Sequence, residues 1–478
     1  MVKKLKRPKI IFLLILLFSL IMVISLASDV AIGQFLGPKH KFPYDKLDSH
    51  TRDFSTNLPI FVLETDVSEL YNGSKSNPSA LPPLATIWVF DNGVNNRLTN
   101  TPAYSFVNAT ANYRGHSSIG FPKKPYKIKL YDNLLDKSKH DSFLGLPPAS
   151  DWVLRSPYAD KSLLRDWFAY EIAATVLEWQ PRGGMVQLFL KDGENGEPEY
   201  QGVYFLCEYV TVGKNRLDLG DFNLDSSDSI DFAGGGYLFQ RDRPNRGLNF
   251  ISFPDNCQAT YRLMYPTINN LNLYENMDFR NEVIFYHDLL TRTGRFSDVP
   301  PDEWNFRDYI DVNSFIDYIL VGELLKTIDA GQFSSFMYRP VGEKLRMGPL
   351  WDCDFSMGNI DYYGTHFDGF PIMNRHLFIQ LSRDDEFATN FVDRYISLRA
   401  GLWSDDFIFG LFDSMVEYLT EAAVQEAERW PEKFDGQTYI IPNPEPYTTS
   451  WEEEIIRTRQ WLENRISWLD EYVSQLVK

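Results

Sequence analysis

The sequence predicts an α+β protein with two lobes, and three observations support this. Between residues 57 and 253, short apolar runs are separated by Gly, Pro and Asn, which is typical of a β-rich lobe. Between residues 254 and 478, apolar residues recur at helical spacing, which predicts a mainly helical lobe. The chain has 478 residues, of which 44% are apolar and 23% charged, so it can bury a large core. Its length suits one large two-lobed unit, although two to three ordinary domains are also open.

The β-rich lobe is predicted to contain strands, one helix and a hairpin. Residues 160–179 form the predicted helix, with Asp160 as its N-cap and Glu171 on its otherwise apolar stripe. The runs at residues 185–193 and 199–210 predict a hairpin. Further strands are expected in LPIFVLET (58–65), ATIWVFDN (85–92), AYSFVNATANYRG (103–115), PYKIKLYD (125–132) and GGGYLFQRD (234–242).

The helical lobe is predicted to contain helices around one short β segment. Residues 281–294 and 311–329 have helical periodicity. Residues 334–340 and 344–355 return to a strand pattern. From Ser382 to Lys478 we expect helix almost throughout.

The N-terminus carries a targeting signal. A basic leader precedes an apolar run from Ile10 to Ala27, and Ser25-Leu26-Ala27 has the small-x-small form of a signal-peptidase site. The run also reaches the lower end of the length that spans a bilayer, so residues 1–28 are either a signal peptide or a membrane anchor. Residues 29–56 are then a polar linker. In both cases we expect the folded part outside the cytosol, with membrane contact only through this segment.

Charge, cysteine content and motifs exclude several function classes. A formal net charge of −18 argues against nucleic-acid binding, which depends on Lys and Arg. Cys207, Cys257 and Cys353 are an odd number without a C-x-x-C pair, which argues against a zinc site or a disulfide scaffold and leaves at most one bridge. The common nucleotide-binding and hydrolase motifs, such as G-x-G-x-x-G, G-x-x-x-x-G-K-[ST], H-E-x-x-H and G-x-S-x-G, are absent.

Two acids in the run GPLWDCDFSMGN are candidate metal ligands. Asp352 and Asp354 are two residues apart in a predicted strand, so their side chains would lie on the same face. Two close carboxylates repel each other unless a cation lies between them, and their hard oxygens suit magnesium, calcium or manganese. The alternative is a turn with two solvated acids.

Further charged residues complete what phosphoryl transfer requires. Lys127 and Lys129 alternate with apolar residues, so one strand face carries two ammonium groups, and Glu171 could pair with one of them. Asp329 stands at the end of a predicted helix and could orient an acceptor hydroxyl. Each has a structural alternative: the lysines as a solvated strand face, Glu171 as a surface residue and Asp329 as a turn residue. These features alone predict no more than a metal-dependent enzyme.

Five blocks of the sequence, in the same order, resemble the CotH kinase family. The resemblance runs from about Leu58 to the C-terminal helix, and only the segment from Pro254 to Asp302 matches poorly. The resemblance implies a diverged, two-lobed, atypical protein-kinase-like fold that uses ATP with Mg²⁺ or Mn²⁺ and phosphorylates Ser or Thr of secreted, spore coat or surface proteins. The blocks are YRGHSSIGFPKKPYKIKL, LPPASDWVLRSPYADKSLLRDWFAYEIA, EYQGVYFLCEYV, FIDYILVGELLKTIDAGQFSSFMYRP and KLRMGPLWDCDFSMGN.

The resemblance also implies roles for individual residues. Asp329 matches the catalytic acid of the family, and Asp352 and Asp354 match its metal-binding W-D-x-D motif, with Cys353 where an aromatic residue is usual. Position in the strand and helix suggests Lys127 for phosphate binding and Glu171 as its partner. The segment between the lobes suggests adenine contacts from the backbone of Glu208, Tyr209 and Val210.

Two other function classes stay open at this stage. One is a non-catalytic surface adhesion or binding protein on the same fold, since a fold does not determine its function. The other is a carbohydrate-active protein, suggested by the Trp and Tyr content and the paired acids. Glycosidase acids usually need different environments, however, and Asp352 and Asp354 share one.

Overall fold

The computed structural model describes most of the sequence after residue 41. The described residues are 42–70, 82–132, 137–220, 236–243, 250–252, 260–266, 277–291, 305–360, 366–435 and 447–477. The apolar run Ile10–Ala27 and Cys257 lie outside these residues. Within them, no helix is both long enough and apolar enough to cross a bilayer. The mixture of helices and strands confirms the α+β prediction.

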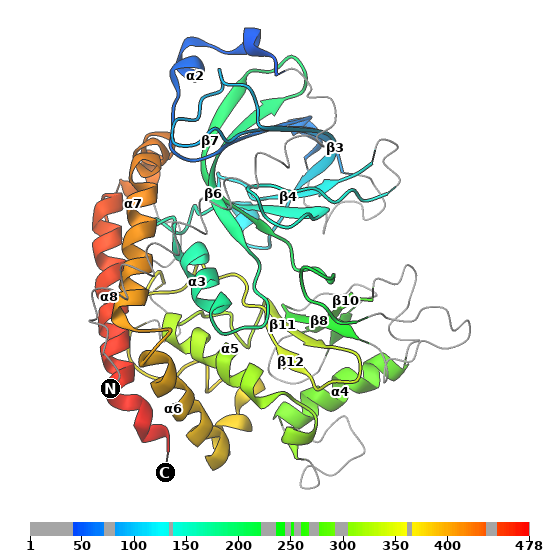
Figure 1. Cartoon of the computed structure of the whole chain (residues 1–478), viewed down its shortest axis with the longest axis vertical. Helices are drawn as coiled ribbons and strands as arrows, with labels where there is room; N and C mark the ends of the chain where they lie inside the picture. The colour runs from blue at the N-terminus through cyan, green and yellow to red at the C-terminus, as the bar shows by residue number, and fades with distance from the viewer. Residues whose placement is uncertain are drawn as a thin grey trace, which may run out of the picture.

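Seven strands form a closed barrel, drawn at the top of Figure 1. Neighbouring strands pair antiparallel in the order β1-β2-β3-β4-β5-β7-β6, and β1 closes the barrel by pairing parallel to β6. Alternating side chains such as Phe61, Ile87 and Trp152 fill the interior. The strands are β1 Ile60–Thr65, β2 Leu84–Phe90, β3 Tyr104–Tyr113, β4 Tyr126–Leu130, β5 Asp151–Arg155, β6 Gly183–Asp192 and β7 Pro198–Glu208.

The folded part begins before the predicted boundary at residue 57. Phe42 and Leu47, which lie in the predicted linker, are buried against Trp88 and Phe90 of β2. Close to them lies the short helix α2 (Ser49–Asp53). Part of the predicted linker is therefore packed on the barrel.

A second sheet lies below the barrel (Figure 1) and has the strand order β12-β11-β8-β10-β9. The strand predicted at residues 234–242 belongs to this sheet, because β8 pairs with β11, whose sequence lies almost a hundred residues later. The strands are β8 Tyr237–Asp242, β9 Phe250–Ser252, β10 Thr260–Tyr265, β11 Ser335–Arg339 and β12 Arg346–Met347.

Helices cover one side of both sheets. The helix α5 (Val312–Leu325) is almost entirely buried, which explains its apolar sequence, and it contacts α3 (Arg165–Ala174), α6 (Asp385–Arg399) and α8 (Trp451–Tyr472). Figure 1 shows α7 (Asp405–Arg429) and α8 side by side along the molecule, with α7 reaching β7 of the barrel. The remaining helices are α4 Met277–Thr291 and the 3-10 turns Tyr44–Lys46, Val67–Glu69, Ser118–Gly120, Phe306–Asp308, His376–Phe378, Leu381–Arg383, Pro431–Phe434 and Val473–Leu476.

Two predicted elements differ from the structure, and the strands β5, β9 and β10 were not predicted. The helix predicted from residue 160 begins at Arg165, and Asp160 is not its N-cap. The Asp160 carboxylate instead accepts hydrogen bonds from Ser162 N and Arg165 N, which hold residues 160–164 as a turn. The strand predicted over residues 344–355 ends at Met347.

Candidate active site

Five of the eight predicted site residues line a cleft of about 510 Å³ between the barrel and the second sheet. Asp329, Asp352 and Asp354 line it from below, and Lys127 and Tyr209 line it from the barrel side. Its other walls come from the β3–β4 loop, the end of β5, the start of α3 and strand β8. A larger cavity of about 1140 Å³, between α2, β7 and α7, contains none of the predicted site residues. The chemistry-bearing side chains therefore converge at one place.

Asp352 and Asp354 lie on a loop, because Asp352 adopts a left-handed backbone conformation with φ of 56°. A non-glycine residue at positive φ is uncommon and needs support from its surroundings. That support includes the backbone of Leu350, which exchanges two hydrogen bonds with the Gln180 side chain, and Cys353 N, which donates to Asp166 Oδ1 at 2.8 Å. The same-face geometry predicted from a strand is therefore wrong, although both acids still line the cleft.

The carboxylate of Asp352 is held in its charged form. Arg155 Nη2 lies 2.8 Å from Asp352 Oδ1, and Ser334 Oγ donates to Oδ2 at 2.6 Å. Burial alone would raise the pKa of Asp352, but Arg155, Arg114 and the Ser334 hydroxyl hold it below its usual value. Asp352 is thus a carboxylate at neutral pH, with protein groups on both oxygens.

Asp354 and Asp329 differ from Asp352, because their surroundings raise the carboxyl pKa instead of lowering it. Burial and the neighbouring charges of Asp166, Asp352 and Asp329 raise the pKa of Asp354 well above its usual value. Burial and the Asp352 charge raise the pKa of Asp329 to about 7, although Arg243 Nη2 lies 3.9 Å from Asp329 Oδ1. Burial and the nearby carboxylates therefore disfavour the charged forms of Asp354 and Asp329, in contrast to Asp352.

Lys127 is already paired at the edge of the cleft. Its Nζ lies 3.1 Å from Asp151 Oδ1 and 4.7 Å from the centre of the Tyr209 ring. Burial tends to lower the pKa of Lys127, but Tyr209 and Asp151 outweigh this effect and raise it. Lys127 is charged and close to the barrel-side wall of the cleft.

Glu171 does not reach the cleft. It lies on the far side of α3, where it lines a separate, largely apolar cavity with Trp167, Met185 and Tyr418. Burial raises its pKa. The structure therefore does not bring Glu171 together with Lys127.

The segment predicted to contact adenine contributes one side chain to the cleft, the Tyr209 ring. The amide groups of Glu208 and Tyr209 already donate hydrogen bonds to Arg182 O and Asp151 O, respectively. The buried carboxylate of Glu208 forms ion pairs with Arg182 and Arg216. The side chain of Val210 is buried in the core. Glu208 and Val210 thus have structural contacts, and the backbone hydrogen bonds predicted for 208 and 209 would have to replace existing ones.

Two residues that the sequence analysis did not select form the centre of the site. Arg155 Nε donates to Asp166 Oδ2 at 2.8 Å, and the Arg155 guanidinium lies 5.0 Å from the Trp351 ring centre. Arg114 lies 5.5 Å from the same ring. The block DWVLRSPYADKSLLRD contains Arg155, but no local pattern distinguishes it from Arg165, which does not line the cleft.

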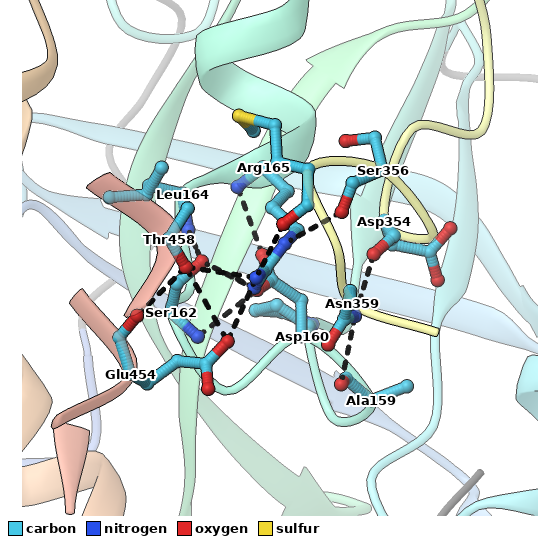
Figure 2. A network of polar contacts seen from close by, with 12 residues as sticks. Ala159, Asp160, Ser162, Leu164, Arg165, Asp354, Ser356, Asn359, Glu454 and Thr458 are labelled. Atoms are coloured by element: carbon cyan, nitrogen blue, oxygen red, sulfur yellow. Dashed lines mark hydrogen bonds and ion pairs between the residues drawn. The ribbon is translucent and has the colours of Figure 1, made fainter. Parts of the chain in front are cut away.

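A buried network fixes the loop that carries the acids (Figure 2). The Arg165 guanidinium, at the start of α3, donates to Ser356 O, Asp160 and Glu454 of α8. Asn359 Nδ2 donates to the backbone carbonyl of Asp354 at 2.7 Å. Figure 2 shows the Asp354 carboxylate pointing away from this network. The loop is therefore anchored through its backbone, and the Asp354 side chain stays available for another partner.

A divalent cation and nucleotide phosphates fit the donors of this cleft. Within the described parts of the chain, no three His, Cys, Asp or Glu side chains form a complete metal cage. Mg²⁺ needs no such cage, because it is commonly held by one or two carboxylates together with substrate phosphates and water. Asp352 and Asp354 would supply the two carboxylates, and a bound cation would favour the ionised form of Asp354, whose pKa burial and nearby acids raise.

Comparison with known proteins places the chain in a family. A family model described as CotH kinase protein matches residues 111–469, which include every residue that lines the cleft. Among curated proteins no match was found. The family match covers most of the chain and agrees with the resemblance noted in the sequence. The chain belongs to the CotH kinase protein family.

Proposed function

We propose that the protein is an exported phosphotransferase that moves the γ-phosphoryl group of ATP to Ser or Thr of a secreted, coat or surface protein. One observation carries the proposal: carboxylates from residues 329 and 352–354 meet guanidinium groups from β3–β4 and β5 in a single cleft. Phosphoryl transfer needs just these groups, since catalysis rests on positioning and charge stabilisation. Membership of a kinase-like family supports the same reaction class.

In this proposal, each residue of the cleft has a separate role in phosphoryl transfer. Asp352 and Asp354 would hold Mg²⁺ or Mn²⁺, which when bound balances the charge of the phosphates. Asp329 would accept a hydrogen bond from the acceptor hydroxyl and take its proton. The β3–β4 loop, in which Gly115 has a φ of +97°, lines the cleft and would cover the phosphates. The loop requires glycine there, because this φ strains any residue with a side chain, and a Cβ would also meet Ser118 Oγ at 2.1 Å.

The architecture supports this assignment. In this proposal the barrel is the nucleotide-binding lobe, the helices with the second sheet are the lobe that binds the protein substrate, and the cleft between them is the active site. Export would depend on the N-terminal segment, and mass spectrometry of the mature N-terminus would distinguish cleavage after Ala27 from an uncleaved anchor.

Asp354→Asn tests the proposal most directly. We expect phosphoryl transfer to fall by about 100-fold or more, because a charge that stabilises the transition state is removed. The stability should stay equal or rise, because burial and nearby acids disfavour the Asp354 carboxylate in the folded state. The measurements are transfer of labelled phosphate from ATP to a Ser-rich acceptor with Mg²⁺ or Mn²⁺, and thermal unfolding.

The matched control is Asp413→Asn, which removes an exposed acid on α7. This variant should transfer phosphate at the wild-type rate. Wild-type transfer by Asp354→Asn would contradict the metal-binding role.

A binding protein without catalysis is the second candidate. The observation that favours it is the pairing of Asp352 with Arg155, which occupies a carboxylate oxygen that a metal would use. In that case a partner protein would bind equally well to Asp354→Asn and to the wild type, and neither would bind ATP.

A further inference from the structure

The guanidinium group of Arg155 has a nitrogen, Nη1, that no group of the described residues satisfies. Nε donates to Asp166, Nη2 pairs with Asp352, and Nη1 is buried without a hydrogen-bond partner among the described residues. The Arg155 side chain is only 9% exposed. A buried unsatisfied donor on a charged group is costly and therefore unusual in a folded protein. Arg155 lines the cleft, so a ligand bound there can supply the missing acceptor once the guanidinium group turns Nη1 toward it.

Asp166 orients Arg155 and connects it to the loop that carries Asp352 and Asp354. The two oxygens of Asp166 are divided between Arg155 Nε on β5 and the backbone amide of Cys353. Both contacts are 2.8 Å long. Asp166 therefore fixes the distance between the arginine and the loop that carries Asp352 and Asp354, and it is a positioning residue.

From this geometry we infer that Arg155 is the main phosphate-binding cation of the protein, and that Asp166 on α3 holds it in place. The ligand is a phosphate group of a nucleotide, which accepts a hydrogen bond from Nη1. This inference rests on the proposed function and assigns the two roles that the sequence suggested for Lys127 and Glu171. Lys127 is less suited, because its ammonium group pairs with Asp151 at the edge of the cleft, whereas Arg155 pairs directly with the proposed metal ligand Asp352.

The test compares ligands that differ only in phosphate. Calorimetry measures the binding of ADP and of adenosine to the wild type and to Arg155→Met, each with Mg²⁺ and with a chelator. We expect ADP binding to weaken by about 10- to 100-fold in Arg155→Met, the range for losing a charge-assisted hydrogen bond, while adenosine binding is unchanged. The loss should persist with the chelator, because the contact is direct.

Further variants keep the test decisive. Arg155→Met leaves Asp166 and Asp352 without their cation, so Arg155→Lys is the second variant. It keeps the charge but loses the planar fork, and ADP binding should weaken by a smaller factor. Asp166→Asn should also weaken ADP binding selectively. Arg459→Met, at an arginine on α8 that lies outside the cleft, is the matched control and should bind ADP as the wild type does.

The outcomes separate this inference from the proposed function. If the wild type binds ADP and both Arg155 variants bind it equally well, the inference is wrong and the proposed function stands. A loss seen only with Mg²⁺, or a larger selective loss in Lys127→Met, also overturns it. If the wild type binds neither ADP nor ATP under any condition, both fail.

Discussion

At the scale of single residues, a substitution of Asp329 should reduce catalysis without weakening nucleotide binding. It lines the cleft from the turn after α5 and has no assigned contact to phosphate in the proposed site. Asp329→Asn should therefore reduce phosphoryl transfer by about 100-fold or more, because the proton acceptor is lost, and should leave ADP binding within about twofold of the wild type. Transfer assays and calorimetry on the same preparation check both expectations. A variant that loses ADP binding would place Asp329 among the phosphate or metal contacts instead.

The acids were predictable from the sequence, but their cationic partner was not. Asp329, Asp352 and Asp354 stand in short, distinctive motifs, and all three line the cleft. Glu171 and Asp166 lie on the same helix, five residues and so about 140° apart, and face different sides of it. Most of α3 is buried, so its apolar pattern did not show which face meets the cleft.

At the scale of secondary-structure elements, a buried ion cluster holds α7 against the barrel. The Glu426 carboxylate accepts hydrogen bonds from Lys123, Lys433 and the backbone amide of Val203. Burial alone would raise the pKa of Glu426, but the two lysines hold it below its usual value of 4.5. A lowered carboxyl pKa contributes stability that is present above pH 4.5 and is lost as the pH falls through the folded-state value.

Glu426→Gln should lower the free energy of unfolding by about 3–5 kcal/mol near pH 7, because it leaves two buried lysines without their anion. The difference from the wild type should shrink below pH 4.5, where protonation removes the same charge in the wild type. Urea unfolding at several pH values measures it. The control Glu463→Gln, at a partly exposed ion pair on α8, should change stability by less than about 1 kcal/mol. A deficit that is equally large at pH 3 and pH 7 would show that packing, not charge, explains the loss.

The elements themselves were largely predictable, and their long-range pairing was not. Most strand and helix runs were recognised from local periodicity, including the β6–β7 hairpin and the helices α5 and α8. The helices after Ser382 were expected only as one continuous stretch, and β5, β9 and β10 were not predicted. Barrel closure needs β1 to pair with β6, and the second sheet needs β8 to pair with β11. Local patterns carry no information about such partners. The strand predicted at residues 344–355 ends at Met347 because Gly348 has a φ of +124° and Pro349 has no amide hydrogen to donate to a ladder.

At the scale of the whole molecule, the two long C-terminal helices join the parts on either side of the cleft. On α7, Gln425 donates to Ser55 O and Arg429 donates to Tyr200 O, so it is bound to the barrel. On α8, Arg465 donates to Glu323 O of α5. Residues 57–253 expressed alone, without α7, should therefore not fold cooperatively. Circular dichroism and thermal unfolding of that fragment check this, and a sharp transition near the wild-type temperature would contradict it.

The contact between Gly202 and Glu426 has a consequence for how relatives of this protein can diverge. Gly202 has a φ of +96°, and a methyl group there would come within 2.1 Å of Glu426 Oε2. Both this contact and the backbone conformation therefore require glycine at residue 202. A shorter residue at 426 would relieve only the contact, so relatives that keep this strand geometry should keep the glycine even where the acid is lost.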